Sequence, residues 1–236
     1  MEQQTVERPA DAAYTRRRRG ALFYLGLALL LAGLGMLGYV AWQFFGTNIV
    51  SHQKQQAAVH HLEQTWHADA SAGASAHTKG TDLGSADALI RIPRFGKSYV
   101  MPVFEGVGED VLAKGFGHFR HTAPPGGVGN YALAAHRITH GEPLRNMPEL
   151  RPGDKVIVET RHKVYTYVLD TNPNDLVVSF TNIWVIAPLP HNPVPGGVEP
   201  KQKPGQHLIT LTTCSELFHT DNRMIAFGHL VSSKRK

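Results

Sequence analysis

The chain has 236 residues, a hydrophobic content of 42% and a formal net charge of +5, values that suit one or two folded domains. Apart from the run Arg16–Arg19, the positive charge is spread along the chain, and no basic stripe is interleaved with aromatic residues. This pattern excludes a nucleic-acid-binding class. It remains compatible with a partner such as a membrane surface or an acidic cell-wall polymer.

The N-terminal segment from Ala21 to Phe45 contains no charged side chain and is long enough to cross a bilayer as a helix. Arg16–Arg19 immediately precede this segment, and the next cationic residue after it is Lys54. The positive-inside rule therefore predicts a single-pass cell-membrane protein with a cytoplasmic N-terminus. A cleaved signal peptide is the alternative, although no small-x-small cleavage site follows the run, and both interpretations export the C-terminal part.

These features divide the chain into four parts. We expect a cytoplasmic tail at 1–20, a transmembrane helix at 21–45, an extracytoplasmic stalk or linker at 46–86 and one folded catalytic domain at 87–236. The stalk is rich in Ala, His, Gln, Ser and Gly, and its first part, Thr47 to Trp66, is compatible with a helix.

From Asp87 onward the pattern changes to short strands separated by Pro and Gly clusters. The predicted strands are Ala88–Ile92, Asn130–Ala135, Lys155–Glu159, Val164–Leu169, Leu176–Ser179, Trp184–Ala187, His207–Thr213 and Met224–Val231. Weaker helical patterns are present around Glu109–Lys114 and Glu142–Leu150. About eight strands in this length predict an all-β fold with one closed or nearly closed barrel.

The chain has a single cysteine, Cys214, which cannot form an internal disulfide. An unpaired thiol in an exported chain indicates a reactive or intermolecular role, and a buried inert cysteine is the alternative. Strand alternation puts Cys214 on the face opposite to Thr213. It also ends its strand where a loop begins, which suits a nucleophile that substrate must reach.

Two further residues complete a possible acyl-transfer site. Arg223 begins the next strand, so antiparallel pairing would bring it beside Cys214, where a cation favours the thiolate and can donate to an oxyanion. Taken alone, Arg223 is more simply an exposed charge at a strand edge. His136 follows the strand Asn130–Ala135 and would supply the acid and base that a cysteine nucleophile needs. Three other histidines compete for that role, namely His118, His121 and His140.

The residues around these positions resemble a known family. Leu211-Thr-Thr-Cys214, followed by Arg223, resembles the TLxTC…R signature of sortases, and Asn130–Arg137 resembles the histidine motif of that family. Upstream matches in the same order are Ile92-Pro93, Val103–Gly106, Val111–Gly115 and Gly117-His118. The resemblance covers about Ala88 to Leu230. It implies an eight-stranded sortase-type β-barrel with short helices, preceded by one transmembrane helix.

The resemblance also implies a chemistry and its partners. Cys214 would attack the threonine carbonyl of an LPxTG- or LAxTG-like sorting signal to form a thioester. His136 would protonate the departing amine and deprotonate the incoming one, Arg223 would hold the oxyanion, and Thr212 and Thr213 would contact substrate. The partners would be surface proteins that carry the signal and an amine of a peptidoglycan precursor or a pilin. No cofactor is implied. No metal is expected either, because the sequence has no clear acidic cluster.

Within the family the chain is most similar to class E or the neighbouring class D, on the segments Ala134–Arg137 and Trp184–Pro188. Class E would imply LAxTG-like signals and a diaminopimelate-type wall acceptor. Two alternatives from other classes remain. One is an L,D-transpeptidase-like cysteine acyltransferase, whose Ser-x-Gly-Cys element the chain lacks. The other is a non-catalytic membrane-tethered barrel that binds partners.

Overall fold

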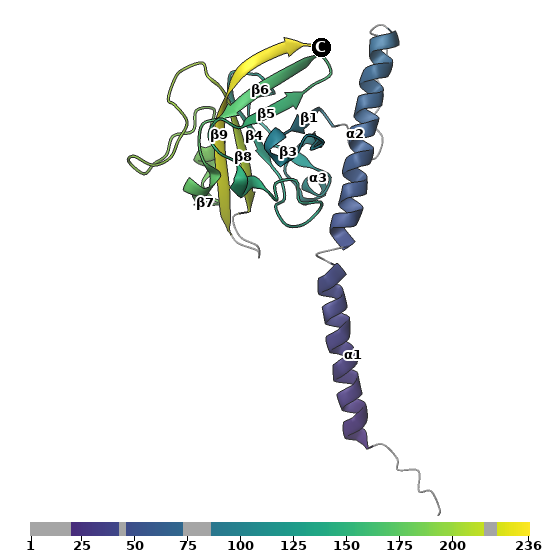
Figure 1. The fold of residues 1–236 in the computed structure, drawn as a ribbon. Helices are drawn as coiled ribbons and strands as arrows, with labels where there is room; N and C mark the ends of the chain where they lie inside the picture. The colour runs from purple at the N-terminus through teal and green to yellow at the C-terminus, as the bar shows by residue number, and fades with distance from the viewer. Residues whose placement is uncertain (1–19, 43–45, 73–85, 215–220) are drawn as a thin grey trace, which may run out of the picture. The chain divides into compact units, whose positions relative to one another are not determined.

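The computed structural model describes residues 20–42, 46–72, 86–214 and 221–236 (Figure 1). Residues up to Ala41 form one compact unit, and Trp42–Lys236 form a second. The first unit contains α1 (Ala21–Ala41), a helix long and apolar enough to cross a membrane. It covers most of the predicted span, whose residues 43–45 lie outside the described part.

The second unit is built on a closed β-barrel, as predicted. Eight strands close it in the order β6-β5-β1-β2-β3-β4-β8-β9, because β6 also pairs with β9. A ninth strand, β7, adds to β9 outside the ring. The strands are β1 (Ala88–Arg91), β2 (Met101–Glu105), β3 (Phe116–His118), β4 (Gly129–Ala134), β5 (Lys155–Glu159), β6 (Lys163–Leu169), β7 (Val177–Ser179), β8 (His207–Cys214) and β9 (Asn222–Arg235).

Two pairings in the barrel are parallel, β2 with β3 and β4 with β8, and the others are antiparallel. Parallel neighbours need long connections, so short helices and loops lie between the strands. These helices are α3 (Glu109–Leu112) and the 3₁₀ turns η2 (Pro93–Phe95), η3 (Met147–Glu149), η4 (Pro173–Asp175) and η5 (Ile183–Ile186).

The strand predictions have one error and two omissions. Trp184–Ala187 is not a strand, since Ile183–Ile186 form the turn η5, and a short apolar run does not distinguish the two by periodicity. Strands β2 and β3 were not predicted. Pro102 inside β2 masks the strand pattern, and β3 has only three residues.

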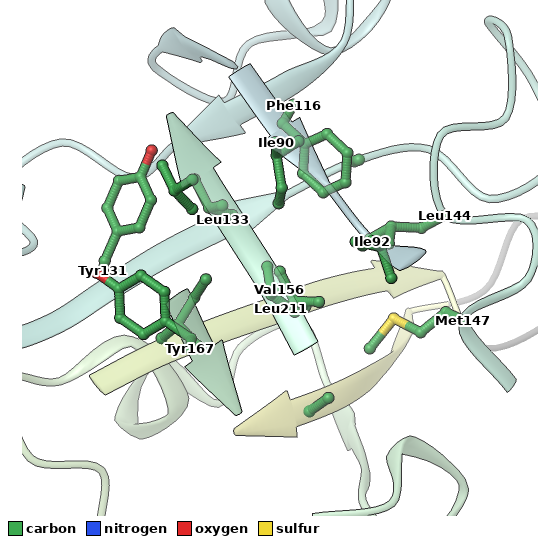
Figure 2. Close-up of a cluster of buried hydrophobic side chains, with 14 of the residues drawn as sticks. Ile90, Ile92, Phe116, Tyr131, Leu133, Leu144, Met147, Val156, Tyr167 and Leu211 are labelled. Carbon is green, nitrogen blue, oxygen red and sulfur yellow. The ribbon is translucent and has the colours of Figure 1, made fainter. Parts of the chain in front are cut away.

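One face of each strand fills the barrel interior. Figure 2 shows Ile90, Phe116, Leu133, Val156 and Leu211, from five different strands, directed into one cluster. All five are fully buried. Burial of side chains of this size stabilises a fold by about 1.5–3 kcal/mol each. The barrel is therefore a packed scaffold that holds the strand ends in fixed positions.

The outer face of β4, β8 and β9 is covered by the segment that contains η5. Ile225 and Phe227 of β9 pack there against Leu176 and Val185 in a second cluster. Buried Asn130 of β4 fastens the cover, because its Nδ2 donates to the carbonyls of Val185 and Ala187, each at 3.1 Å. Both faces of these strands are thus buried, and only their ends are open for chemistry.

Residues assigned by sequence to the stalk form the long helix α2 (Thr47–Ala72). Its residues Val59 and Leu62 pack on Leu89 of β1, which is fully buried beneath them. Further along the helix, Glu63 lies 3.2 Å from Arg91, and the Nζ atom of the C-terminal Lys236 lies 4.2 Å from the Trp66 ring centroid. The helix is therefore part of the same compact unit as the barrel.

Candidate active site

Three strand ends meet on one side of the barrel. The parallel register of β4 and β8 pairs Ala134 with Thr212, and the Ala135 amide continues it by donating to the Thr212 carbonyl at 3.2 Å. Two residues beyond this register pair in each segment are His136 and Cys214. On the other side of β8, Cys214 is the register partner of Arg223. The antiparallel pairing predicted for these two residues is confirmed.

His136 and Arg223 each adjoin a residue of the interior cluster. Ala135 and Met224 belong to the interior cluster, so their neighbours His136 and Arg223 alternate to the opposite face.

Arg223 is not at a free strand edge. Its backbone pairs with Val178 of β7 on one side and Cys214 of β8 on the other. The side chain is half-buried, with its guanidinium carbon 6.0 Å from the centre of the Phe180 ring and one N–H donating to the Asn222 carbonyl at 3.1 Å. The backbone pairing fixes Arg223 next to the end of β8, so the interpretation as an exposed charge at a strand edge is wrong.

His136 is partly buried and lies near the loop that follows it and near the short helix α3. Its ring stacks on His140 with centroids 4.7 Å apart and 28° between the planes. Its Nε2 lies 3.6 Å from an Oε1 atom of Glu109, the first residue of α3, which is longer than a hydrogen bond. Among the described residues this buried Nε2 has no hydrogen-bond partner.

The surroundings of His136 favour its neutral form. Burial and the neighbouring His140 lower its pKa below the usual 6.5, and Arg223 acts in the same direction, while Glu109 opposes them. A neutral imidazole at neutral pH accepts a proton, which is the property required of a base next to a thiol.

The competing histidines are placed differently. His118 has both ring nitrogens engaged, Nδ1 at 2.7 Å from Glu105 and Nε2 at 2.9 Å from the Thr122 hydroxyl, so it is a structural residue of β3. His121 is exposed and lies in a turn with a φ of 67°. His140 is the only competitor in contact with His136 within the described part of the chain.

Thr212 and Thr213 are both buried next to the cysteine. The Thr213 hydroxyl donates to the Ala135 carbonyl at 2.7 Å and so ties β8 to the residue before His136. This bond gives Thr213 a structural role, and contact of either threonine with substrate stays a prediction. Sequence reasoning did not assign a role to Glu109 or to the contact of His140 with His136, because both depend on loop conformation.

The site groups three residues that are potential metal ligands, although the sequence led us to expect no metal. One ligand atom each from Glu109, His136 and His140 lies within 4.8 Å of the others. The lone pairs of imidazole nitrogens lie in the ring planes, and two nearly parallel stacked rings do not direct them to one point. One ring would have to leave the stack before both could bind the same ion.

The comparisons with known proteins agree with this geometry. The model of the sortase domain matches residues 90–231. Sortase SrtE1 of Streptomyces coelicolor is 31% identical over 98% of this chain, which spans 62% of that relative's length. Sortase SrtE2 of the same organism is 27% identical over 93% of the chain and 88% of its own length.

Solved structures give the same assignment. Sortase E from Streptomyces avermitilis aligns with a TM-score of 0.55 and 38% identity over 64% of this chain and 90% of its own. Sortase E1 from S. coelicolor, solved with a tripeptide in its active site, aligns with the same score at 34% identity over the same shares of the two chains. The chain therefore belongs to the sortase family, whose members are cysteine transpeptidases, and it is most similar to class E.

Proposed function

We propose that this chain is a membrane-anchored sortase that cleaves a sorting signal of the LPxTG or LAxTG kind after its threonine. It then joins the threonine to an amine of the cell wall or of a pilin. The observation that carries the proposal is the meeting of the ends of β4, β8 and β9, which brings together the positions of His136, Cys214 and Arg223.

The reaction has two steps. In the first, neutral His136 takes the proton of the Cys214 thiol, the sulfur bonds to the threonine carbonyl carbon, the threonine–glycine C–N bond breaks, and the resulting imidazolium gives that proton to the departing amine. In the second, His136 removes a proton from the acceptor amine, whose nitrogen displaces the sulfur. Arg223 stabilises the negative charge that develops on the carbonyl oxygen in both steps.

The anchor and its orientation belong to the same proposal. The apolar helix α1 would span the membrane once, with the N-terminus in the cytoplasm because Arg16–Arg19 precede it. The unit from Trp42 to Lys236 would then lie outside the cell, where sorting-signal proteins and wall amines occur. Similarity to class E favours LAxTG-like signals and a diaminopimelate-type acceptor.

The test is to incubate the detergent-solubilised chain with LPxTG or LAxTG peptides, with and without diaminopimelate, and to follow intact mass. We expect an increase equal to the acyl fragment on Cys214, which disappears when the amine is added. Cys214→Ala is the control and should remain unmodified. Absence of a thioester with every such peptide contradicts the proposal, and a thiol unreactive toward alkylating reagents would favour a non-catalytic barrel.

A further inference from the structure

Helix α2 contacts the loop that follows His136. The buried face of the helix has two parts. Towards its C-terminal end, Val59 and Leu62 make apolar contacts with the barrel. Towards its N-terminal end the buried positions include the polar Ser51 and Gln55, which are 4% and 2% exposed. Most polar side chains buried this deeply have a hydrogen-bond partner, and Gln55 has one through its Nε2, while its buried Oε1 has none among the described residues.

Gln55 and Asn48, one turn before Ser51, bond to three consecutive residues of the loop. Gln55 Nε2 donates to the His140 carbonyl at 2.9 Å. The Gly141 amide donates to Asn48 Oδ1 at 3.0 Å, and Asn48 Nδ2 donates to Glu142 Oε1 at 2.9 Å. Asn48 and Gln55, which are seven residues or about two helical turns apart, thus hold the loop at three successive residues.

The loop has a backbone that needs such support. His140, Gly141 and Glu142 have φ values of 54°, 78° and 50°. Outside glycine this region costs on the order of 1–3 kcal/mol per residue, and it persists only where surrounding contacts enforce it. Gly141 also leaves no room for a side chain, since a Cβ there would lie 2.5 Å from Gln55 Oε1.

The restrained loop reaches the active site through His140, whose ring stacks on His136 at 4.7 Å. The conformation of the loop therefore determines where the ring stacked on His136 lies. The other charged groups that act on His136 among the described side chains are Glu109 of α3 and Arg223 of β9.

We propose that Gln55 and Asn48 of α2 are positioning residues for His136, and that they act by fixing the loop at residues 140–142. The inference rests on the proposed function for its consequence in catalysis. Its structural part, the control of the His136 ring by α2, stands independently. The stalk region is accordingly a support of the active site as well as a connection to the membrane anchor.

The experiment uses the full chain in detergent and compares Gln55→Ala with Gln56→Ala. Gln56 is the neighbouring residue of the same type, but its side chain is exposed. Displacement of a reacting group by about 1 Å can cost a factor of about 100 in rate, so we expect Gln55→Ala and Asn48→Ala to lower kcat about 10- to 100-fold with little change in KM. Gln56→Ala should match the wild type.

A paired substitution separates positioning from loss of folding. Asn48→Asp keeps the acceptor for the Gly141 amide but places a carboxylate against Glu142, and we expect it to lower kcat. When Glu142→Gln is added, the new amide at position 142 donates a hydrogen bond to the new carboxylate at position 48, the reverse of the wild-type direction. This double variant should recover most of the lost kcat. Failure of this rescue, or an equal loss in Gln56→Ala, overturns the proposal.

A second readout does not depend on activity. In the Cys214→Ala background, imidazole NMR titrations should show that Gln55→Ala shifts the resonances and the titration midpoint of His136, whereas Gln56→Ala does not. If the wild type forms no thioester with any peptide, the proposed function fails while this measurement still decides whether α2 positions His136. Unchanged His136 signals in Gln55→Ala overturn the inference.

Discussion

The protonation of His136 links the site to the stability of the protein. Burial and His140 lower its pKa below 6.5, so the unfolded chain binds this proton at a pH where the folded chain does not. The contribution of His136 to the free energy of unfolding therefore increases as pH rises. This increase is complete above the unfolded pKa of about 6.5.

We accordingly expect the melting temperature of the wild type to rise more steeply than that of His136→Gln between about pH 5 and 7.5. The measurement is thermal unfolding at several pH values, with the difference between the two proteins removing the effect of the other histidines. Parallel curves for the two proteins would show that the local environment does not depress the pKa.

The guanidinium of Arg223 is a planar fork of hydrogen-bond donors, which a lysine cannot reproduce. The backbone of Arg223 is paired with a strand on each side. We expect Arg223→Lys to lower the rate of thioester formation about 10²- to 10³-fold, the usual effect of losing an oxyanion donor. Single-turnover mass spectrometry measures this rate. Arg235→Lys, at the exposed end of the same strand, is the matched control and should leave it unchanged.

At the scale of elements, the cover over β4 and β8 depends on one buried amide. Asn130 donates to two carbonyls of the η5 segment and accepts from the Thr210 hydroxyl at 2.8 Å. The Thr210 hydroxyl also contacts the Val185 carbonyl at 3.2 Å, so Asn130→Ala removes the Asn130 bond to the Ala187 carbonyl without replacement and should cost about 1–3 kcal/mol of unfolding free energy.

Chemical denaturation of Asn130→Ala, Thr210→Val and the double variant measures that cost. Because the two side chains share one hydrogen bond, the losses should add to more than the loss in the double variant. Strict additivity would mean that Asn130 and Thr210 stabilise the cover independently.

The sequence indicated those elements whose signal is local. Alternating strands such as β5 and β6, and the strand ends carrying His136, Cys214 and Arg223, follow from periodicity and motif order. The contacts that hold the loop next to His136 cannot be predicted in this way, because Gln55 and His140 are 85 positions apart in the sequence. A polar stripe on α2 also lacks the apolar period by which a packed helix is recognised in sequence.

At the scale of the whole molecule, the two compact units have opposite surface properties. The side chains of α1 are exposed and apolar, whereas Trp42–Lys236 enclose a core of their own. We expect the full chain to fractionate with membranes and a chain of residues 42–236 to be soluble and folded.

Cell fractionation and circular dichroism test this expectation, and protease added to intact protoplasts tests the orientation. The protease should remove the barrel and leave the N-terminal tail protected. Protection of the barrel would contradict the proposed topology, and replacement of Arg16–Arg19 by alanines should weaken the preference for it.

The parallel pairing of β4 with β8 also affects when the active site forms during folding. The Thr213–Ala135 bond that fixes this pairing joins residues 78 positions apart, and contacts between such distant segments form late in folding. A chain that emerges with its N-terminus first presents His136 long before Cys214. On the proposed topology, we therefore expect the enzyme to be inactive during translocation and to become active only in the last stage of barrel closure, after the anchor has entered the membrane.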